Sequence, residues 1–304
     1  MSKSDLIIPQ HERTREQLTR LQALPLEQKI NLTLRRIEQF YTQMGGKVYV
    51  SFSGGKDSTV LLHLVRSLYP EVKAVYLNTG VEFPGINDFV KTFNNVDWVK
   101  PRMSFASVLK KYGYPMPSKE VAQKIFEIKN TNSDKLRNKR LYGDEKGNGK
   151  IAEKGKYLID EDIKISHKCC DVLKKNPAKS YEHRTGLAPI IGTMAGESRL
   201  RENSWLRNGC NAFDGKRPKS NPLASWNEED IWAYIKKNSL DYAQPYKDGE
   251  ERTGCMYCLF GCQFNDNDGA MRFDRMKEKY PLHYKAAEFW GIIKALEILK
   301  RVDK

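Results

Sequence analysis

The sequence predicts an α/β fold built on a doubly wound parallel sheet. Short apolar runs at 47–52 and 72–77 read as buried strands, and each is followed by a segment whose apolar residues recur at helical spacing. Strands that alternate with helices at this spacing are typical of parallel sheets, because each helix carries the chain back to the start of the next strand. An N-terminal helix and a cysteine-containing, helical C-terminal region complete the expected architecture.

The first expected element is an amphipathic helix from Pro25 to Met44. Its apolar positions recur at helical spacing, with Pro25 near the start and Gly45-Gly46 at the end. The spacing then predicts a strand at 47–52, a helix at 57–68, a strand at 72–77 and a helix near 86–93. We expect an N-terminal segment at 1–45, a nucleotide-binding domain at 46–240 and a C-terminal region at 241–304.

Three later segments are also readable. Residues 129–157 are rich in Lys, Asn, Asp and Gly, which predicts a mobile surface insertion or lid. A helix should follow residues 225–230, with Ser225 or Asn227 as its cap, and the tail from Tyr284 to Leu299 is helical by the same spacing.

Composition restricts the class of protein. The chain has 304 residues, with 52 Lys and Arg against 38 Asp and Glu, for a net charge of +14. This excess favours a polyanionic partner such as nucleic acid, while a solvated surface with a site for ATP is the alternative. No apolar run has membrane-spanning length, and the charged start at Met1–Asp5 has no signal-peptide core, so we expect a cytoplasmic protein with reduced thiols.

The stretch Ser51–Ser58 joins a predicted strand to a predicted helix. Its two glycines allow the backbone to approach an oxyanion closely, the helix start supplies free N–H groups, and Ser53 and Ser58 add hydroxyl donors. A phosphate is the expected ligand. A Walker loop is excluded because Val50 stands where its first glycine would be, and the dinucleotide fingerprint is absent.

Five of the six cysteines fall in two clusters, Cys169-Cys170 and Cys255-x-x-Cys258-x-x-x-Cys262. Such spacing is usual for iron–sulfur and zinc sites, so either group is expected from the residues alone. Cys210 stands apart and reads as a small apolar residue.

The segment Ser53-Gly54-Gly55-Lys56-Asp57-Ser58 resembles the PP-loop signature S-G-G-x-D-S of ATP pyrophosphatases, which split ATP between the α and β phosphates. The resemblance implies an adenine nucleotide alpha hydrolase-like fold in which the loop amides hold pyrophosphate. It also implies that Asp57 helps to hold Mg²⁺.

Further segments are similar to the phosphoadenosine phosphosulfate reductase-like family of PP-loop proteins. They are Thr79-Gly80-Val81-Glu82-Phe83-Pro84, His167-Lys168-Cys169-Cys170-Asp171, the stretch from Trp226 to Tyr246, and the C-x-x-C pair that follows it. The family's iron–sulfur branch implies a [4Fe-4S] cluster, with zinc as the alternative. The segment Gly192–Arg201 adds a glycine turn and two arginines suited to phosphate or sulfate, or else forms a surface loop ion-paired through Glu197.

These patterns together name a candidate site. The catalytic candidates are Lys56, Asp57 and Arg199. The nucleotide-binding candidates are Ser51, Ser53, Gly54, Gly55, Lys56, Asp57, Ser58, Asn78, Thr79, Gly80, Gly192, Arg199 and Arg201. The cluster ligands are Cys169, Cys170, Cys255 and Cys258, with Cys262 as the substitute if only one of the adjacent pair binds.

Two departures from the sulfonucleotide reductases favour another activity. No cysteine follows Cys262, and the loop keeps the glycine pair found in members that bind ATP. The sequence therefore favours an ATP-dependent sulfurtransferase that adenylates a substrate, either tRNA or DNA, and receives sulfur from a donor such as a cysteine desulfurase. The alternatives are a sulfonucleotide reductase, an ATP sulfurylase-like enzyme, or a non-catalytic nucleotide- and nucleic-acid-binding subunit.

Overall fold

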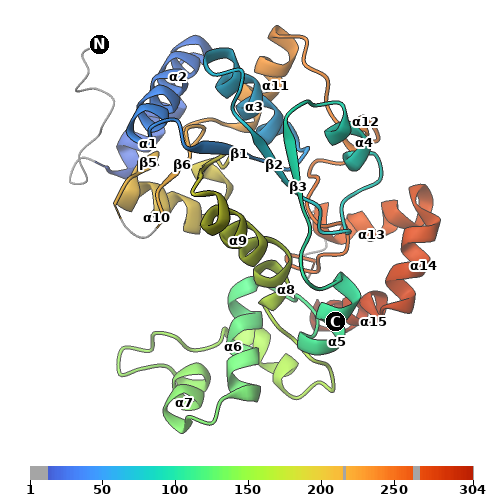
Figure 1. Cartoon of the computed structure of the whole chain (residues 1–304). Helices are drawn as coiled ribbons and strands as arrows, with labels where there is room; N and C mark the ends of the chain where they lie inside the picture. Colours follow the sequence, from blue (N-terminus) through green and yellow to red (C-terminus); the bar gives the residue numbers. More distant parts are fainter. Residues whose placement is uncertain (1–12, 215–216, 263–267, 304) are drawn as a thin grey trace. The chain divides into compact units, whose positions relative to one another are not determined.

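The computed structural model describes residues 13–214, 217–262 and 268–303 (Figure 1). The charged start at Met1–Asp5, on which the cytoplasmic expectation depends, lies outside these ranges. The chain forms two compact units. The sheet unit comprises 1–77, 84–99 and 178–253, and the cysteine unit comprises 78–83, 100–177 and 254–304.

The sheet unit is organised around six strands. They are β1 (Val48–Phe52), β2 (Ala74–Leu77), β3 (Val96–Val99), β4 (Ala188–Ile191), β5 (Asn211–Ala212) and β6 (Lys219–Ser220). Their order is β3-β2-β1-β4-β6-β5, and every pair is parallel except β5 with β6. Val50 lies opposite Ala74 on one side and Ile190 on the other. The predicted α/β fold with a mostly parallel sheet is confirmed.

This strand order creates a switch point between β1 and β4. From β1 the chain winds outward to β2 and β3, and then returns to add β4 on the opposite side of β1. In such sheets ligands bind beyond the carboxyl ends of the two strands at the reversal. The segments that follow β1 and β4, starting at Ser53 and Gly192, therefore leave the sheet at the same edge.

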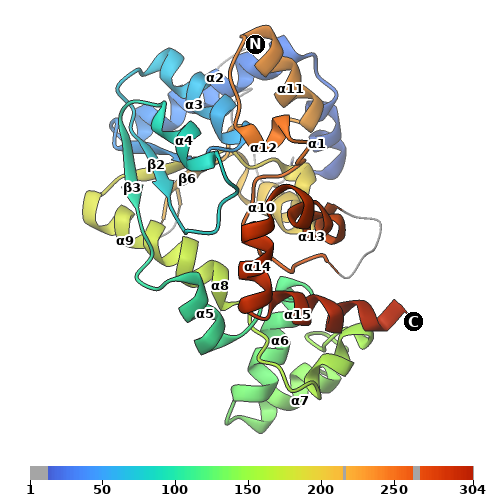
Figure 2. The same cartoon turned by 90° about the vertical axis from the view of Figure 1, so that its right-hand side faces the viewer.

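Helices cover both faces of the sheet (Figures 1 and 2). The helices of this unit are α1 (Arg15–Gln22), α2 (Leu26–Gln43), α3 (Lys56–Leu68), α4 (Ile86–Lys91), α9 (Asn176–Thr185), α10 (Arg199–Asn208), α11 (Glu228–Lys237) and α12 (Gln244–Lys247), with a 3₁₀ turn at Ala195–Glu197. Helices α2, α3 and α11 pack together. Tyr181 of α9 packs with Tyr49 and Val75, whose side chains point to one face because strand residues alternate.

The cysteine unit is helical. Its helices are α5 (Phe105–Tyr112), α6 (Lys119–Asn130), α7 (Asp134–Tyr142), α8 (Lys168–Cys170), α13 (Asp268–Lys279), α14 (Pro281–Phe289) and α15 (Ile292–Leu299), with a π-helical turn at Asp171–Lys175 and 3₁₀ turns at Glu153–Ile159 and Lys300–Asp303. The tail predicted to be helical from Tyr284 to Leu299 is helical, but it is divided between α14 and α15. Gly291 adopts φ +70° and separates α14 from α15, because a left-handed residue cannot continue a right-handed helix.

The segment 129–157 contains ordered elements that its polar composition did not predict. Helix α7 begins after Ser133, whose hydroxyl accepts a hydrogen bond from the backbone N–H of Leu136. Ile151 is buried and anchors the far end of the segment. Mobility of this segment stays a prediction, and so do the boundaries expected at 45 and 240, which divide the chain differently from its two compact units.

Helices in the described part of the chain are all too short or too polar to cross a membrane.

Candidate nucleotide site and cysteine cluster

The loop after β1 has the geometry of an anion-binding turn. Gly54 adopts φ +71°, and a Cβ there would lie 3.0 Å from a methyl carbon of Val90. Gly55 is extended and precedes the first turn of α3. The Ser58 hydroxyl accepts a hydrogen bond from the Ser53 N–H at 3.1 Å and donates to the Gly55 carbonyl at 2.8 Å. This arrangement fixes the turn at the positive end of the α3 dipole.

Lys56 is the first residue of α3, and only 4% of it is exposed. Its amine donates to the Glu251 carbonyl at 3.1 Å and pairs with Glu228 at 3.0 Å. The same amine lies over the rings of Trp232 and Tyr246, at 5.9 and 5.2 Å from their centroids. A buried ammonium needs such partners, because desolvation disfavours its charge.

Residues 246–253 contact the loop directly. The backbone N–H of Lys56 donates to the Tyr246 hydroxyl at 3.1 Å, and that hydroxyl also bonds the Thr253 hydroxyl at 2.9 Å. A Cβ on Gly55 would lie only 2.9 Å from the Thr253 Oγ1 atom. Because these two hydroxyls lie about 190 residues beyond the loop, no local sequence pattern predicted their contact with it.

Asp57 is a buried carboxylate with an unsatisfied oxygen. Its Oδ1 atom has no hydrogen-bond partner among the residues that the structure describes. Burial raises its pKa, the nearby Glu228 adds to the rise, and Lys56 and Arg201 oppose it. A buried carboxylate oxygen without a partner is suited to a divalent cation, which prefers oxygen ligands. Asp57 therefore fits the Mg²⁺ role that its motif implied.

The segment after β4 meets this loop. A Cβ on Gly192 would lie 3.1 Å from the Asp57 carbonyl oxygen, so the two chains approach closely. Arg201 is half-buried and ion-paired with Glu197. Burial lowers its pKa, the neighbouring Arg252 lowers it further, and Asp57 opposes both. The Arg201 guanidinium therefore lies near the unsatisfied carboxylate, and that of Arg252, which the sequence did not single out, lies near Arg201.

Other predicted nucleotide-binding residues are placed differently. The side chain of Arg199 is exposed, and within the described ranges no hydrogen bond or ion pair holds it. Asn78, Thr79 and Gly80 belong to the cysteine unit. There the Glu82 carboxylate accepts hydrogen bonds from the hydroxyl of Thr79, at 2.5 Å, and from the Gly80 N–H, at 2.9 Å.

All four predicted cluster ligands lie in the cysteine unit. Burial raises the pKa of the Cys169 thiol, and negative charge on Cys255, Cys170 and Cys258 would raise it further. Burial likewise raises the pKa of Cys258 to about 12, with Cys255 and Cys170 adding to the rise. Thiols that shift one another's pKa in this way are close in space. The fold thus brings together two pairs that are about 85 residues apart in sequence.

Two cations accompany these thiols. Lys174 donates a hydrogen bond to Cys255, and negative charge on that thiol raises the lysine's pKa. Arg272 is buried and donates to the Cys258 carbonyl at 2.5 Å. Cys262 is also buried, with its thiol donating to the Cys258 carbonyl at 3.5 Å and lying 3.6 Å from Arg272.

Cysteine sulfur is a donor that both zinc and iron–sulfur clusters accept. Nowhere in 13–214, 217–262 and 268–303 do three His, Cys, Asp or Glu side chains form a group that could hold a single metal ion. Zinc binds four such thiolates around one ion, and a [4Fe-4S] cluster binds four around a larger body. The buried cations would offset part of the thiolates' negative charge.

The chain is similar to several proteins of known sequence. An uncharacterized protein of Methanocaldococcus jannaschii is 27% identical over 262 residues, which is 82% of this chain and 49% of that protein. The chain thus spans about half of that relative's length. The adenosine 5'-phosphosulfate reductase of Bacillus mycoides is 25% identical, over 81% of this chain and 87% of the reductase.

The solved structure of the U34-tRNA thiolase NcsA from Methanococcus maripaludis with its [4Fe-4S] cluster covers 91% of this chain and 80% of its own, at 15% identity and a TM-score of 0.40. That similarity is too low to carry an argument about this chain. The sequence model of the phosphoadenosine phosphosulfate reductase domain family matches residues 47–259 of this chain. This range includes the loop after β1, the segment after β4 and the four predicted cluster ligands. The chain therefore belongs to the phosphoadenosine phosphosulfate reductase domain family.

Proposed function

We propose that this protein is an ATP pyrophosphatase that adenylates a nucleic-acid substrate and directs sulfur to the activated position. The unsatisfied carboxylate of Asp57, beside Lys56 and Arg201 at the switch point of the sheet, is the observation that carries the proposal. A nucleoside triphosphate with Mg²⁺ supplies both a cation for this carboxylate and anions for the neighbouring donors.

The residues at the loop of the sheet unit each have a role in this reaction. The amides and hydroxyls of the loop hold the β and γ phosphates at the N-terminus of α3. Lys56 neutralises charge on the departing pyrophosphate, and Arg201 with Arg252 faces the charge that develops on the α phosphate. Asp57 would hold Mg²⁺, which would neutralise the phosphate oxygens when bound.

The chemistry has two balanced steps. A substrate oxygen attacks the α phosphorus, the bond from that phosphorus to the bridging oxygen breaks, pyrophosphate leaves with the electron pair, and the substrate loses one proton to solvent. Hydrosulfide then attacks the carbon that bears the adenylated oxygen, the carbon–oxygen bond breaks, AMP leaves with the electron pair, and the proton of hydrosulfide stays on the product. No oxidant or reductant is consumed.

The cysteine unit would hold the sulfur-handling group. Cys169, Cys170, Cys255 and Cys258 would ligate a [4Fe-4S] cluster, whose chemistry is to bind and present sulfide. Lys174 and Arg272 orient and neutralise the surrounding thiolates through the contacts with Cys255 and with the Cys258 carbonyl.

A nucleic-acid substrate is supported by the distribution of charge. The cysteine unit has 28 Lys and Arg against 18 Asp and Glu, a net +10, whereas the sheet unit has 24 against 20, a net +4. The excess positive charge is thus concentrated in the unit that carries the cysteines. A polyanion would be attracted there.

Product analysis tests the proposal. Anaerobically purified protein should convert Mg-ATP to AMP and pyrophosphate when bulk tRNA and sulfide are present, with sulfur appearing in the RNA. Asp57→Asn should abolish pyrophosphate release while leaving the circular dichroism spectrum unchanged. ADP and phosphate as the products would contradict the proposed cleavage.

The second candidate is a sulfonucleotide reductase, which the similarity to the Bacillus reductase favours. Sulfite release from a sulfonucleotide in the presence of thioredoxin would establish this activity. Turnover in neither assay would favour the accessory-subunit alternative.

A further inference from the structure

Helix α7 in the cysteine unit presents lysines and a tyrosine along one face. Lys135, Lys139 and Tyr142 are spaced i, i+4 and i+7, which places them in line on a helix. Lys135 and Lys139 are exposed, and Tyr142 is 71% exposed. The exposed ring lies in line with the two lysines, so it is open to a ligand that the lysines attract.

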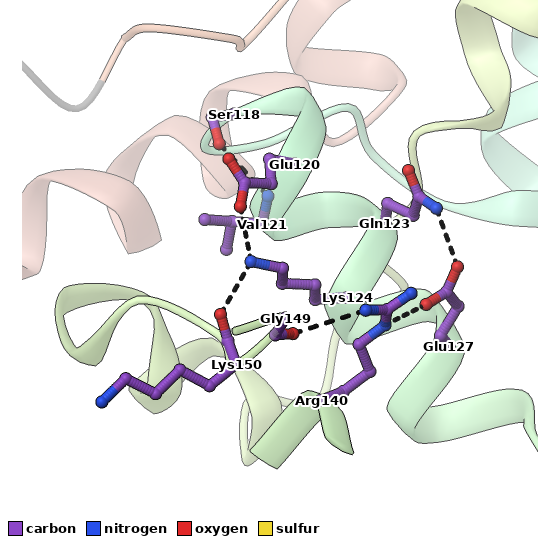
Figure 3. Close-up of polar contacts among 9 residues, drawn as sticks. All are labelled: Ser118, Glu120, Val121, Gln123, Lys124, Glu127, Arg140, Gly149 and Lys150. Carbon is purple, nitrogen blue, oxygen red and sulfur yellow. Dashed lines mark hydrogen bonds and ion pairs between the residues drawn. The ribbon is translucent and has the colours of Figure 1, made fainter. Parts of the chain in front are cut away.

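This helix has no core of its own. None of its nine residues, all of them described, is buried. Instead, Arg140 holds α7 to α6 through an ion pair with Glu127, and it also donates to the Gly149 carbonyl at 3.4 Å (Figure 3). A helix that is polar all round gains little from hydrophobic burial. Its exposed face is therefore not needed for packing and is open to a ligand.

The polar contacts leave a specific set of cations unpaired. Lys124 pairs with Glu120 and donates to the Lys150 carbonyl at 2.7 Å, and Arg137 pairs with Asp134. Lys139 has only a 3.4 Å contact to Asp144. Over the described ranges, no acidic partner pairs with Lys135, Lys146, Lys150 or Lys154. In Figure 3 the side chain of Lys150 points away from the network that its carbonyl joins.

Helix α6 connects this surface to the cysteines within the same unit. The α6 residue Phe126 contacts the His167 ring, 5.9 Å between centroids, and Lys119 at its start lies close enough to Cys170 for the charge on that thiol to affect the lysine's pKa. The twelve residues of α6 span about 18 Å. A single-stranded nucleic-acid segment of a few nucleotides is long enough to span the length of α6.

We propose that Lys135, Lys139, Tyr142 and Lys146, here called the α7 face, bind a single-stranded segment of nucleic acid. The lysines contact consecutive phosphates, and the Tyr142 ring stacks on an unpaired base. A membrane would require an apolar stripe that α7 lacks, and an acidic protein would leave the exposed ring without a stacking partner. This inference rests on the proposed function, because it gives that function's substrate a docking site.

Binding of a short fluorescein-labelled single-stranded RNA tests the α7 face by fluorescence anisotropy over a series of salt concentrations. Tyr142→Ala should weaken binding about 5- to 150-fold, the range for loss of one stacked base. Lys135→Gln with Lys139→Gln should reduce the slope of log affinity against log salt by about 1.4, because two phosphate contacts are lost.

Matched controls separate the face from general effects. Phe289→Ala removes another exposed aromatic residue, and Lys179→Gln with Lys236→Gln removes two exposed charges of the sheet unit. These variants should bind as the wild type does. Equal affinity of the α7-face variants and the wild type would overturn the proposal, and so would equally tight binding of polyglutamate or of a fully paired duplex.

The two proposals can fail separately. If α7-face variants lose RNA binding while the wild type forms no AMP, the docking site stands and the proposed reaction fails. If the wild type adenylates RNA and the variants bind it as tightly, the reaction stands and the docking site fails.

Discussion

The sheet unit and the cysteine unit carry their positive charge in different ways. In the sheet unit, Lys56 is buried among Glu228, a carbonyl and two aromatic rings, and the net charge is only +4. In the cysteine unit, with a net +10, lysines such as Lys135 and Lys146 lie exposed and unpaired within the described residues. Buried charges recognise one small anion by geometry and are weakly screened, whereas exposed charges attract a polyanion and respond strongly to salt. The two charge distributions are those that the proposed function requires, with a small anion at the sheet unit and a polyanion at the cysteine unit.

The strongest effect should come from a substitution of Asp57, which should change the activity of the sheet unit and leave the cysteine unit unchanged. Asp57→Asn should lower AMP formation by at least about 100-fold, because the nucleotide loses its cation ligand. Its iron content should equal that of the wild type, since Asp57 belongs to the sheet unit. Pyrophosphate release and iron are measured on the same preparation. Loss of iron together with activity would show that the units are not independent.

The next effect should be confined to the cysteine unit. Cys258→Ser should lower iron and sulfide content at least about tenfold, since even partners outside the ligand set change metal affinity by that factor. Cys262→Ser should keep its iron, because its thiol is engaged with the Cys258 carbonyl and Arg272. Cys210→Ser in the sheet unit is the control. If Cys258→Ser retained its iron and Cys262→Ser lost it, Cys262 rather than Cys258 would be the cluster ligand.

A smaller effect is expected at the loop. Tyr246→Phe removes the hydroxyl that accepts from the Lys56 N–H and bonds Thr253, which should destabilise the nucleotide-free protein by about 1 kcal/mol. Thermal unfolding should show the loss as a decrease in Tm of about 2–4 °C. Tyr142→Phe on α7 is the matched control, since that ring is exposed. No change in Tm for Tyr246→Phe would mean that water replaces the hydroxyl.

The smallest effect is a pH dependence of stability. Burial raises the pKa of Asp57 in the folded protein, so the ionised carboxylate lowers the free energy of unfolding. This cost is absent below the unfolded pKa of about 3.9 and develops as pH rises through the folded value. Asp57→Asn should therefore have a higher Tm than the wild type at pH 7, and the gain should vanish toward pH 3. A Tm difference that does not change with pH would contradict this account.

Local patterns in the sequence predicted much of the fold. The strand, glycine turn and helix from Val48 to Leu68 follow from neighbouring residues, and Asn227 caps α11 as expected. Strand β3 was missed because its four residues, Val96–Val99, are only partly buried and too few to show a period. Helix α7 was missed because its stability comes from side-chain contacts with α6.

The candidate site was less predictable than the fold. The sequence named both Arg199 and Arg201, and only the structure shows that Arg201 lies near Asp57 while Arg199 is exposed. Tyr246 and Thr253 reach the loop through tertiary contacts across about 190 residues, which no local pattern encodes. The cysteines were identifiable because metal-binding spacing is itself local.

The contacts of Lys56 also bear on how a nucleotide enters. The donors that a triphosphate would use are already satisfied by the Tyr246 hydroxyl, Glu228 and the Glu251 carbonyl. Under the proposed function, binding would therefore be an exchange of partners, in which residues 246–253 withdraw as phosphate oxygens arrive. The apparent affinity is the intrinsic affinity reduced by the fraction of molecules in which this segment has withdrawn. Under the proposed function, withdrawal of this segment would therefore act as a conformational gate that limits the rate of nucleotide capture at high concentration.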